Sequence, residues 1–362
     1  MDATTLPARY YVDPDHFHRE RARVFGQMWT CVGRVGDVTE VGDHALREVD
    51  GESLIVVRES TEHINVFYNV CRHRGTRICE AATGHAMRLQ CPYHAWTYGL
   101  DGRLVAAPHF DEGDGFRKAD HGLKRIACEV WDGHVFVNLA DQPAPLAEQL
   151  GDLPRRFAAW GMGDLRRGAR AVYSVAANWK LIIQNYSECL HCPVIHPALQ
   201  KVSHYLSGEN EPGGPDSNFL GGRMDLREGI ATMSLDGKRR RANLPGLDAE
   251  ACRHVSYYAV LPNLLLSLHP DYMMTHVLYP VATDRTKVVC EWHFHPDEMA
   301  RPGFDPSDAV AFWDLTNRQD WHVSELTQLG MTSRAYEPGP YSSREDLLHA
   351  FDRWVVAREG EG

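Results

Sequence analysis

Residues 184–196, QNYSECLHCPVIH, place one carboxylate, two cysteines and two histidines close together. His191 and His196 are candidate metal ligands, because neutral imidazole is a common ligand for metal ions. Cys189 and Cys192 form a C-x-x-C pair, which could act as a redox or zinc pair. That signal is weak without a surrounding βαβ pattern, so we interpret both cysteines as core-facing residues of a helix. The chemistry of this stretch therefore depends on a second cluster upstream.

The second cluster lies in CRHRG, residues 71–75, and CPYHAW, residues 91–96. It contains Cys71-x-His73 and, seventeen residues later, Cys91-x-x-His94. Two cysteines and two histidines could bind one tetrahedral zinc ion, or a [2Fe–2S] cluster with both cysteines on one iron and both histidines on the other. Each loop supplies one cysteine and one histidine within a run of short strands. Cys₂His₂ zinc fingers instead carry an H-x₃₋₅-H pair on a helix, and no such pair is present here. This arrangement favours the iron–sulfur cluster.

A cluster that transfers single electrons needs an acceptor, which gives the residues of the first stretch a reason to lie together. Glu188 and His191 are three residues apart and would share one face of a helix. His196 is five residues further along, about 140° around an unbroken helix, so it needs a distortion that Pro193 supplies. Two histidines and one carboxylate on one face of Fe(II) form the facial triad of non-haem oxygen chemistry.

With these motifs the chain resembles the Rieske non-haem iron oxygenases, namely the alpha subunits of the ring-hydroxylating and quaternary-ammonium monooxygenase family. Respiratory Rieske proteins carry one more cysteine in each loop, where this chain has Thr76 and Tyr93. The resemblance therefore implies a [2Fe–2S] cluster of the lower-potential class that supplies electrons to oxygenases. It also implies that the cluster ligands are Cys71, His73, Cys91 and His94.

The same resemblance extends to the first stretch, where E-x₂-H-x₄-H follows an Asn-Tyr pair. It implies that His191 and His196 bind a mononuclear Fe(II). Glu188 falls on the family's bridging carboxylate, which connects a ligand histidine to the Rieske histidine of a neighbouring subunit. Many ring dioxygenases have Asp there, whereas Glu resembles the branch that oxidises quaternary ammonium compounds. Asn185 is expected to form a hydrogen bond near the iron.

The third iron ligand must come from the late helix. The segment NRQDWHVSELTQLGMTS resembles the family's closing motif, in which the Asp after N-x-Q binds the iron. We therefore expect Asp320 to be the ligand and keep Asp314 as the fallback. The competing interpretation is that Asp320 is a solvated carboxylate on the helix surface.

The resemblance implies a terminal oxygenase that uses O2 and electrons from NAD(P)H through a separate reductase or ferredoxin. A homotrimer is expected, because family members couple one subunit's cluster to the next subunit's iron. For the small-molecule substrate, the Glu bridge favours monooxygenation of an N-alkyl or quaternary ammonium compound, with oxidative demethylation or C–N cleavage. The alternative is mono- or dihydroxylation of an aromatic acid or ring. A Rieske electron carrier without catalytic iron is the alternative from another class.

The bulk composition agrees with such an enzyme. The chain has 362 residues, of which 43% are hydrophobic, and a formal net charge of −11, which argues against a nucleic-acid partner. Residues 1–25 contain no apolar signal region, and no apolar run is long enough to cross a membrane. Nine cysteines form no paired framework. We therefore expect a cytoplasmic protein with no membrane partner.

Positioning two metal sites calls for two kinds of domain. We expect an α+β protein with a small all-β Rieske domain at 32–145 and a larger α+β catalytic domain at 146–362, whose central antiparallel sheet is covered by helices. An N-terminal helical segment, 1–31, should pack on the catalytic domain. The sequence patterns predict helices at 13–31, 178–192 and 307–330, with a linker at 141–150.

The substrate pocket should lie in the catalytic domain. Residues 207–250 are polar and rich in Gly and Pro, so we expect a lid there, and we interpret the basic run 238–241 as a solvated turn. A cationic substrate needs aromatic walls or a carboxylate, whereas an aromatic acid needs a cation and apolar walls. The candidate wall residues are Tyr205, Phe219, Met224, Tyr257, Tyr258 and Tyr272.

Overall fold

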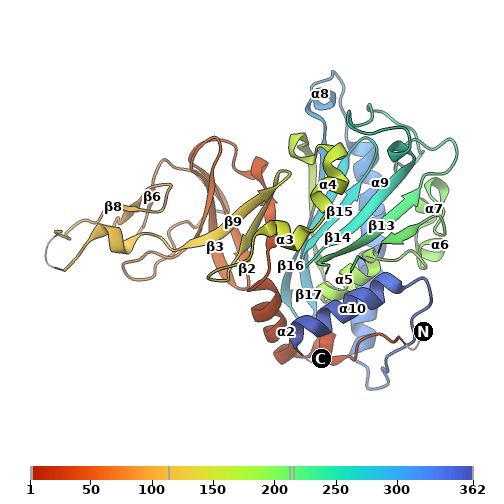
Figure 1. Ribbon diagram of the computed structural model, residues 1–362, viewed down its shortest axis with the longest axis horizontal. Helices are drawn as coiled ribbons and strands as arrows, with labels where there is room; N and C mark the ends of the chain where they lie inside the picture. The colour runs from red at the N-terminus through yellow and green to blue at the C-terminus, as the bar shows by residue number, and fades with distance from the viewer. Residues whose placement is uncertain (1–2, 113–114, 212, 215–216, 361–362) are drawn as a thin grey trace. The chain divides into compact units, whose positions relative to one another are not determined.

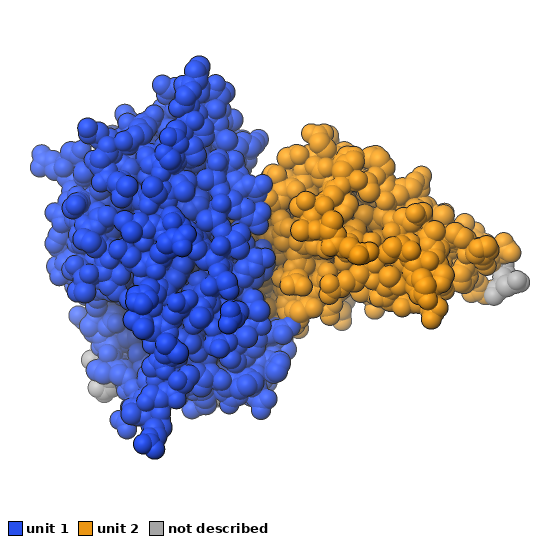
Figure 2. Space-filling view, turned by 180° about the vertical axis from the view of Figure 1, so that it is seen from behind, with its two compact units in different colours: residues 1–24, 145–362 blue, residues 25–144 orange. Residues whose placement is uncertain are grey.

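The computed structural model describes residues 3–112, 115–211, 213–214 and 217–360. The chain forms two compact units, coloured separately in Figure 2. One unit is Phe25–Ala144, and the other combines Met1–Val24 with Pro145–Gly362. The division expected from the sequence, after residues 31 and 145, stays a prediction about domain boundaries. Among the described residues, no helix has the length and apolar character that a membrane crossing requires.

The unit Phe25–Ala144 is built from two antiparallel sheets. The larger has the order β1-β10-β9-β4-β3-β2-β5, and the smaller is β6-β7-β8. The strands are β1 (Thr30–Arg34), β2 (Asp43–Val49), β3 (Glu52–Arg58), β4 (Ile64–Tyr68), β5 (Thr83–His85), β6 (Leu89–Gln90), β7 (Thr97–Tyr98), β8 (Leu104–Ala106), β9 (Arg125–Trp131) and β10 (His134–Asn138), with 3₁₀ turns at Val35–Asp37 and Lys118–His121.

Local sequence explains the hairpin that starts this sheet. Asp50 and Gly51, between β2 and β3, both have positive φ, 51° and 78°. A two-residue loop with this conformation matches the twist of antiparallel strands. Successive residues of β3 then face two different cores, because a strand alternates its side chains. Ile55 packs in the core that contains Cys71 and Cys91, whereas Leu54 packs in the other.

The second unit contains a seven-stranded antiparallel sheet of order β11-β17-β16-β15-β14-β13-β12 with helices packed against it (Figure 1). The fold class expected from the sequence is confirmed. The strands are β11 (Arg166–Val175), β12 (Glu209–Glu211), β13 (Phe219–Asp225), β14 (His254–Val260), β15 (Leu264–Leu268), β16 (Met273–Ala282) and β17 (Arg285–Phe294). The α-helices are α1 (Arg9–Val12), α2 (Pro14–Glu20), α3 (Leu146–Leu150), α4 (Leu153–Phe157), α5 (Trp179–Tyr186), α6 (Cys192–Ile195), α7 (Leu199–Val202), α8 (Pro296–Met299), α9 (Ser307–Met331) and α10 (Asp346–Glu359).

The N-terminal helix is shorter than predicted. Asp13 caps α2 by accepting from two backbone N–H groups, but α2 ends at Glu20 and a π-helical turn ends at Phe25. The remaining residues of the predicted helix lead into β1, because pairing with β10 competes with helix formation there. Within the second unit, Glu20 is buried in an ion pair with Lys180 and accepts from Trp179 Nε1 at 3.1 Å. This pair attaches α2 to α5.

Three other sequence predictions need correction. The predicted linker contains α3, and α9 continues through Gly330 to Met331, one residue beyond its predicted end. The basic run 238–241 is not simply a solvated turn. Arg241 is buried, with its guanidinium 3.0 Å from Asp271 Oδ2 and 2.7 Å from Asp308 Oδ1. A buried arginine needs such partners, because an uncompensated charge in the interior is costly.

Candidate metal centres and substrate pocket

The two Cys/His loops, residues 71–76 and 91–96, have nearly the same backbone. In each loop the N–H of the first residue donates to the carbonyl of the sixth, at 2.8 Å. The N–H of the fifth residue, Gly75 or Ala95, donates to the cysteine carbonyl at 3.0 and 3.1 Å. Both of these fifth residues have positive φ, 78° and 56°. Two similar turns therefore present the predicted ligands.

The side chains of these loops lie together with the cysteines inside and the histidines outside. Cys71 and Cys91 are buried, whereas His73 and His94 are partly exposed, with ring centroids 4.8 Å apart. Trp96 stacks on His73 at 4.9 Å. The sequence analysis did not single out this tryptophan, because no metal motif requires an aromatic residue at that position.

The thiols have the environment that a metal cluster needs. Burial raises the pKa of Cys71, and the neighbouring Cys91 sulfur raises it further, so these two sulfurs require a cation to lie together as thiolates. The Tyr98 hydroxyl lies 3.3 Å from Cys71 Sγ and accepts from Arg72 N at 2.9 Å. Its proton therefore points to the sulfur. Tyr98 is a second residue of this centre that the sequence analysis missed.

The second predicted centre brings together residues from two distant segments. Nε2 of His196 lies 2.9 Å from Asp320 Oδ1, and Nε2 of His191 lies 3.4 Å from the same oxygen. The two imidazole centroids are 5.1 Å apart and nearly perpendicular. His191 and His196 flank α6, and Asp320 lies on α9. Two nitrogens and one carboxylate oxygen thus face one point, as a facial triad requires.

The other nitrogen of each imidazole is held by an acceptor. Glu188 accepts from His191 Nδ1, and Gln319 Oε1 lies 2.8 Å from His196 Nδ1. A carboxylate or an amide oxygen can only accept, so the proton is on Nδ1 in both rings. Each Nε2 faces Asp320 Oδ1, so it is the nitrogen that could exchange a proton for a metal ion. This is the usual arrangement around metal-binding histidines, and Gln319 was not foreseen from the sequence.

The charges also suit a bound cation. Burial alone would lower the pKa of His191, but Asp320 and Glu188 raise it to about 9. Burial would likewise raise the pKa of Asp320, but the two histidines lower it. The fallback residue, Asp314, is bound elsewhere, 2.7 Å from the Tyr173 hydroxyl and 2.8 Å from Arg318 Nε. A site that stabilises a proton between carboxylates also stabilises a divalent metal ion.

The local backbone differs from the predicted continuous helix. Helix α5 ends at Tyr186, where the Ser187 hydroxyl bonds the Ile183 carbonyl at 2.6 Å. Glu188 and His191 therefore lie in a turn, and Pro193 lies in the first turn of α6, where its missing N–H is tolerated. The two imidazoles converge because the chain breaks between two helices. The predicted kink inside one helix is wrong.

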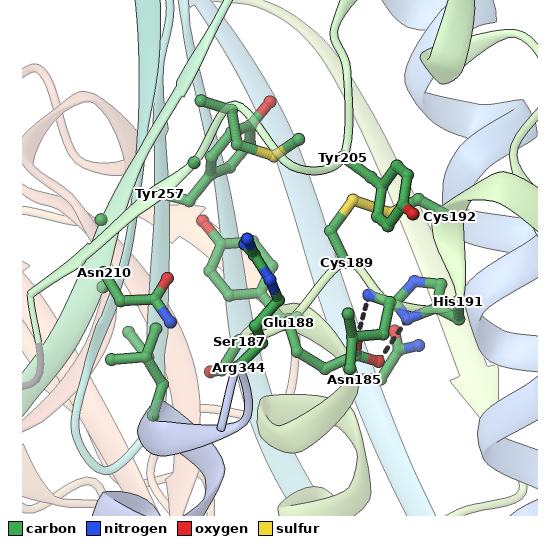
Figure 3. A pocket seen from close by; sticks show the side chains of 18 of the residues that line it. Asn185, Ser187, Glu188, Cys189, His191, Cys192, Tyr205, Asn210, Tyr257 and Arg344 are labelled. Atoms are coloured by element: carbon green, nitrogen blue, oxygen red, sulfur yellow. Dashed lines mark hydrogen bonds and ion pairs between the residues drawn. A yellow bond between two sulfur atoms is a disulfide. The ribbon is translucent and has the colours of Figure 1, made fainter. Parts of the chain in front are cut away.

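Of Cys189 and Cys192, which were predicted to be core-facing helical residues, only Cys192 is buried and helical, at the start of α6. The two cysteines form a disulfide, with 5.0 Å between the Cα atoms. Both residues line the cavity next to His191, as Figure 3 shows. The C-x-x-C spacing, which the sequence analysis set aside as a weak redox signal, is thus the spacing of a bonded pair.

A cavity of about 530 Å³ adjoins the three converging residues. It lies among the end of α5, strands β13 and β14, helix α9 and the start of α10. Trp313 and Asp320 both line it from α9 and are seven residues apart, so about 10 Å separates them along the helix axis. Asn185 lines it too, and its side chain has no hydrogen-bond partner within the part of the chain that the structure describes.

Three aromatic rings form part of the cavity wall. The ring centroid of Tyr257 lies 6.1 Å from that of Tyr186, at an interplanar angle of 77°, and 6.1 Å from that of Trp313, at 67°. Trp313 is held in place by a hydrogen bond from Nε1 to the Tyr272 hydroxyl, at 2.7 Å. Tyr186 and Trp313 were not foreseen from the sequence, because aromatic residues at helical spacing look like ordinary core residues.

The predicted wall residues divide into two groups. Tyr205, Met224 and Tyr257 do line the cavity. The other three, Phe219, Tyr258 and Tyr272, do not, because Phe219 and Tyr258 pack with each other and Tyr272 supports Trp313 from behind. The expected lid, 207–250, contributes strands β12 and β13 to the sheet, and residues 212 and 215–216 within it lie outside the described residues.

Comparison with known families gives these sites an identity. Residues 28–126 match the family described as "Rieske [2Fe-2S] domain", and residues 162–361 match "Ring hydroxylating alpha subunit (catalytic domain)". The chain belongs to the ring-hydroxylating alpha subunit family. As a Rieske non-haem iron oxygenase, it has as cofactors a Rieske [2Fe–2S] cluster and a mononuclear iron. The zinc and electron-carrier alternatives are therefore excluded.

Individual relatives cover nearly the whole of this alpha subunit. It is 33% identical to the glycine betaine monooxygenase oxygenase subunit of Chromohalobacter salexigens, over 93% of this chain and 82% of the relative. It is 34% identical to the carnitine monooxygenase oxygenase subunit of Acinetobacter pittii, over 92% of this chain and 87% of the relative. A crystal structure of the quaternary ammonium Rieske monooxygenase CntA with an inhibitor superimposes with a TM-score of 0.85 at 25% identity, covering 99% and 96%. The chain is thus the oxygenase subunit of a multicomponent system that needs a reductase and a small-molecule substrate.

Proposed function

We propose that this oxygenase subunit monooxygenates a small quaternary ammonium or N-alkyl compound. The observation that carries the proposal is the set of three rings, Tyr186, Tyr257 and Trp313, in the wall of the cavity that reaches Asp320. Ring faces attract an ammonium group, and rings at steep angles present their faces from more than one side. The names of both relatives, for glycine betaine and for carnitine, support the same substrate class.

In the proposed reaction one atom of O2 enters an N-methyl C–H bond and the other leaves as water, with two electrons from the reductase and two protons. The resulting N-hydroxymethyl group breaks down to the demethylated amine and formaldehyde. The iron supplies the oxygen chemistry that amino-acid side chains lack. The aromatic wall holds the methyl group near the iron ligands, and the enclosing strands and helices limit the access of water.

We assign the metal-holding residues on the geometry described above. Glu188 and Gln319 fix the proton of each iron-binding imidazole on Nδ1, so that Nε2 is available to the metal. The proposed cluster ligands are Cys71, His73, Cys91 and His94. The proposed iron ligands are His191, His196 and Asp320.

We further propose that Glu188 links His191 to the Rieske histidine of a neighbouring subunit in a homotrimer. Its contact with His191 Nδ1 and its place in the cavity lining support this role. We also propose that Asn185, in the same lining, forms a hydrogen bond near the iron. A cytoplasmic location, where the reductase and NAD(P)H are available, completes the proposal.

One observation favours a second candidate function. The cavity lining includes Arg344, and a cation next to apolar walls would also suit an aromatic acid. Hydroxylation of an aromatic acid is therefore the alternative to test.

The test is O2 consumption by the purified subunit with a surrogate reductase. Glycine betaine, carnitine and choline would be compared with benzoate and related aromatic acids. We expect O2 uptake coupled to formaldehyde or amine release with at least one N-methyl compound. Coupled turnover of aromatic acids alone would refute the proposal in favour of the alternative.

A further inference from the structure

The cavity lining contains two arginines whose surroundings differ. Arg223, on β13, lies 2.9 Å from Glu209 and 3.9 Å from Glu250. For Arg344, just before α10, no carboxylate of the described residues lies within ion-pair distance of the guanidinium. A guanidinium stays charged at any physiological pH and offers five donors. The Arg344 guanidinium is therefore available to bind an anionic group of a ligand, whereas Arg223 already has carboxylate partners.

The loop that carries Arg344 is held in place by its neighbours. Before it, the buried Tyr341 hydroxyl donates to Asp352 Oδ2 at 2.7 Å. Ser342 N donates to Glu345 Oε2 at 2.7 Å, which closes a turn around Arg344. In Figure 3 the Arg344 side chain rises from this turn into the middle of the pocket. The backbone that carries Arg344 is thus held in place, although the residue itself is exposed.

Apart from the two arginines and the histidines of the proposed iron site, the charged side chains of the cavity are carboxylates. Glu188, Asp320 and Asp346 all line it, and Asn210 Nδ2 donates to Asp346. Glu188 and Asp320 belong to the proposed iron site, so Asp346 is the carboxylate of the lining that favours a cationic ligand and opposes an anionic group near it. A substrate with one positive and one negative end fits a pocket that contains an aromatic wall, carboxylates and one available guanidinium.

We propose that Arg344 binds the carboxylate of a zwitterionic substrate whose ammonium group lies against Tyr186, Tyr257 and Trp313. The subunit then selects betaine-type substrates over cations that lack a carboxylate, such as choline. This inference rests on the proposed function and deepens it, because it names the residue that binds the carboxylate end of the substrate.

The decisive comparison is Arg344→Gln against Arg223→Gln, measured as kcat/KM for glycine betaine, carnitine and choline with a surrogate reductase. A hydrogen-bonded charge pair with a ligand corresponds to about a 10- to 100-fold effect on affinity. We therefore expect Arg344→Gln to raise the KM for both zwitterions by about that factor and to leave choline almost unchanged. Arg223→Gln should change kcat/KM for the zwitterions and for choline by the same factor or not at all, because the Arg223 charge is already paired with carboxylates.

Two further measurements exclude a merely structural effect. Arg344→Lys keeps the charge but loses the forked geometry, so it should restore part of the preference for zwitterions. Iron content and the visible spectrum of Arg344→Gln should match those of the wild type. An equal loss for choline and betaine, or the same result from Arg223→Gln, would overturn the inference.

The outcomes for the proposed function are separate. A wild type that oxidises betaine, with no change of preference in Arg344→Gln, leaves the proposed function intact and removes the role of the arginine. A wild type that oxidises only aromatic acids refutes the proposed function. In that case, kcat/KM of Arg344→Gln is compared for an aromatic acid and for its uncharged amide. A loss for the acid alone shows that Arg344 binds the carboxylate. An equal loss for both overturns that role too.

Discussion

The two centres of this protein are built in different ways. The Cys/His loops, residues 71–76 and 91–96, are two local turns, each closed by its own backbone hydrogen bonds. The proposed iron ligands come from two distant segments. His191 and His196 lie at the break after α5, and Asp320 lies on α9, more than a hundred residues later. The first centre depends on short-range geometry, whereas the second depends on how α9 packs beside α5. The cluster should therefore survive changes that remove the iron.

The largest expected effects come from deleting one proposed ligand in each centre. Asp320→Ala should abolish turnover and lower the iron content by one per chain, while the visible spectrum of the cluster remains. Cys91→Ser should abolish that spectrum and lower the iron content by two, while the single iron remains. Both results follow because each centre draws its ligands from only one of the two compact units. Iron analysis, absorption spectra and product formation measure them.

The matched control is Asp314→Ala, which removes a carboxylate from the same helix, where its partners are Tyr173 and Arg318. It should keep the iron and most of the activity. If Asp314→Ala loses the iron and Asp320→Ala keeps it, the ligand assignment is wrong.

The same contrast explains what could be predicted from sequence. The cluster loops have short fixed spacings, so Cys71, His73, Cys91 and His94 could be predicted together as ligands. The facing of Asp320 toward His191 and His196 was expected only from resemblance to a family, because no local rule connects segments so far apart.

Other features depend on tertiary packing and have no local signal. The helix break after Tyr186 and the Cys189–Cys192 disulfide contradicted a regular helical pattern. The helix α10, which follows Arg344, was not predicted at all. Gln319 and Tyr98 act through contacts with residues of distant strands or turns, and a sequence shows no partner for them.

A smaller effect is expected where Glu188 meets His191. Glu188→Gln keeps an acceptor for His191 Nδ1 but removes the negative charge, so both metals should remain bound. Coupled product formation should fall by about 100-fold, the upper range for residues that act through a metal ligand. Single-turnover reduction kinetics and product yield would measure it. The control Glu325→Gln changes a carboxylate on α9 that accepts from Ala176 N, and it should be silent. Normal product formation by Glu188→Gln would refute the bridging role.

The smallest expected effect tests whether the long-range centre depends on its supporting residues. Gln319→Leu removes the acceptor of His196 Nδ1, so the ring loses the bond that fixes its proton and its orientation. Iron affinity should fall by about 10-fold, the lower range for such partners, while the cluster spectrum stays the same. Gln319→Glu provides the matched control, because a carboxylate accepts the same hydrogen bond and should retain the iron. Titration of the metal-free protein with Fe(II) separates the two variants. Equal affinities in both would mean that packing of α9, without this bond, is sufficient to orient His196.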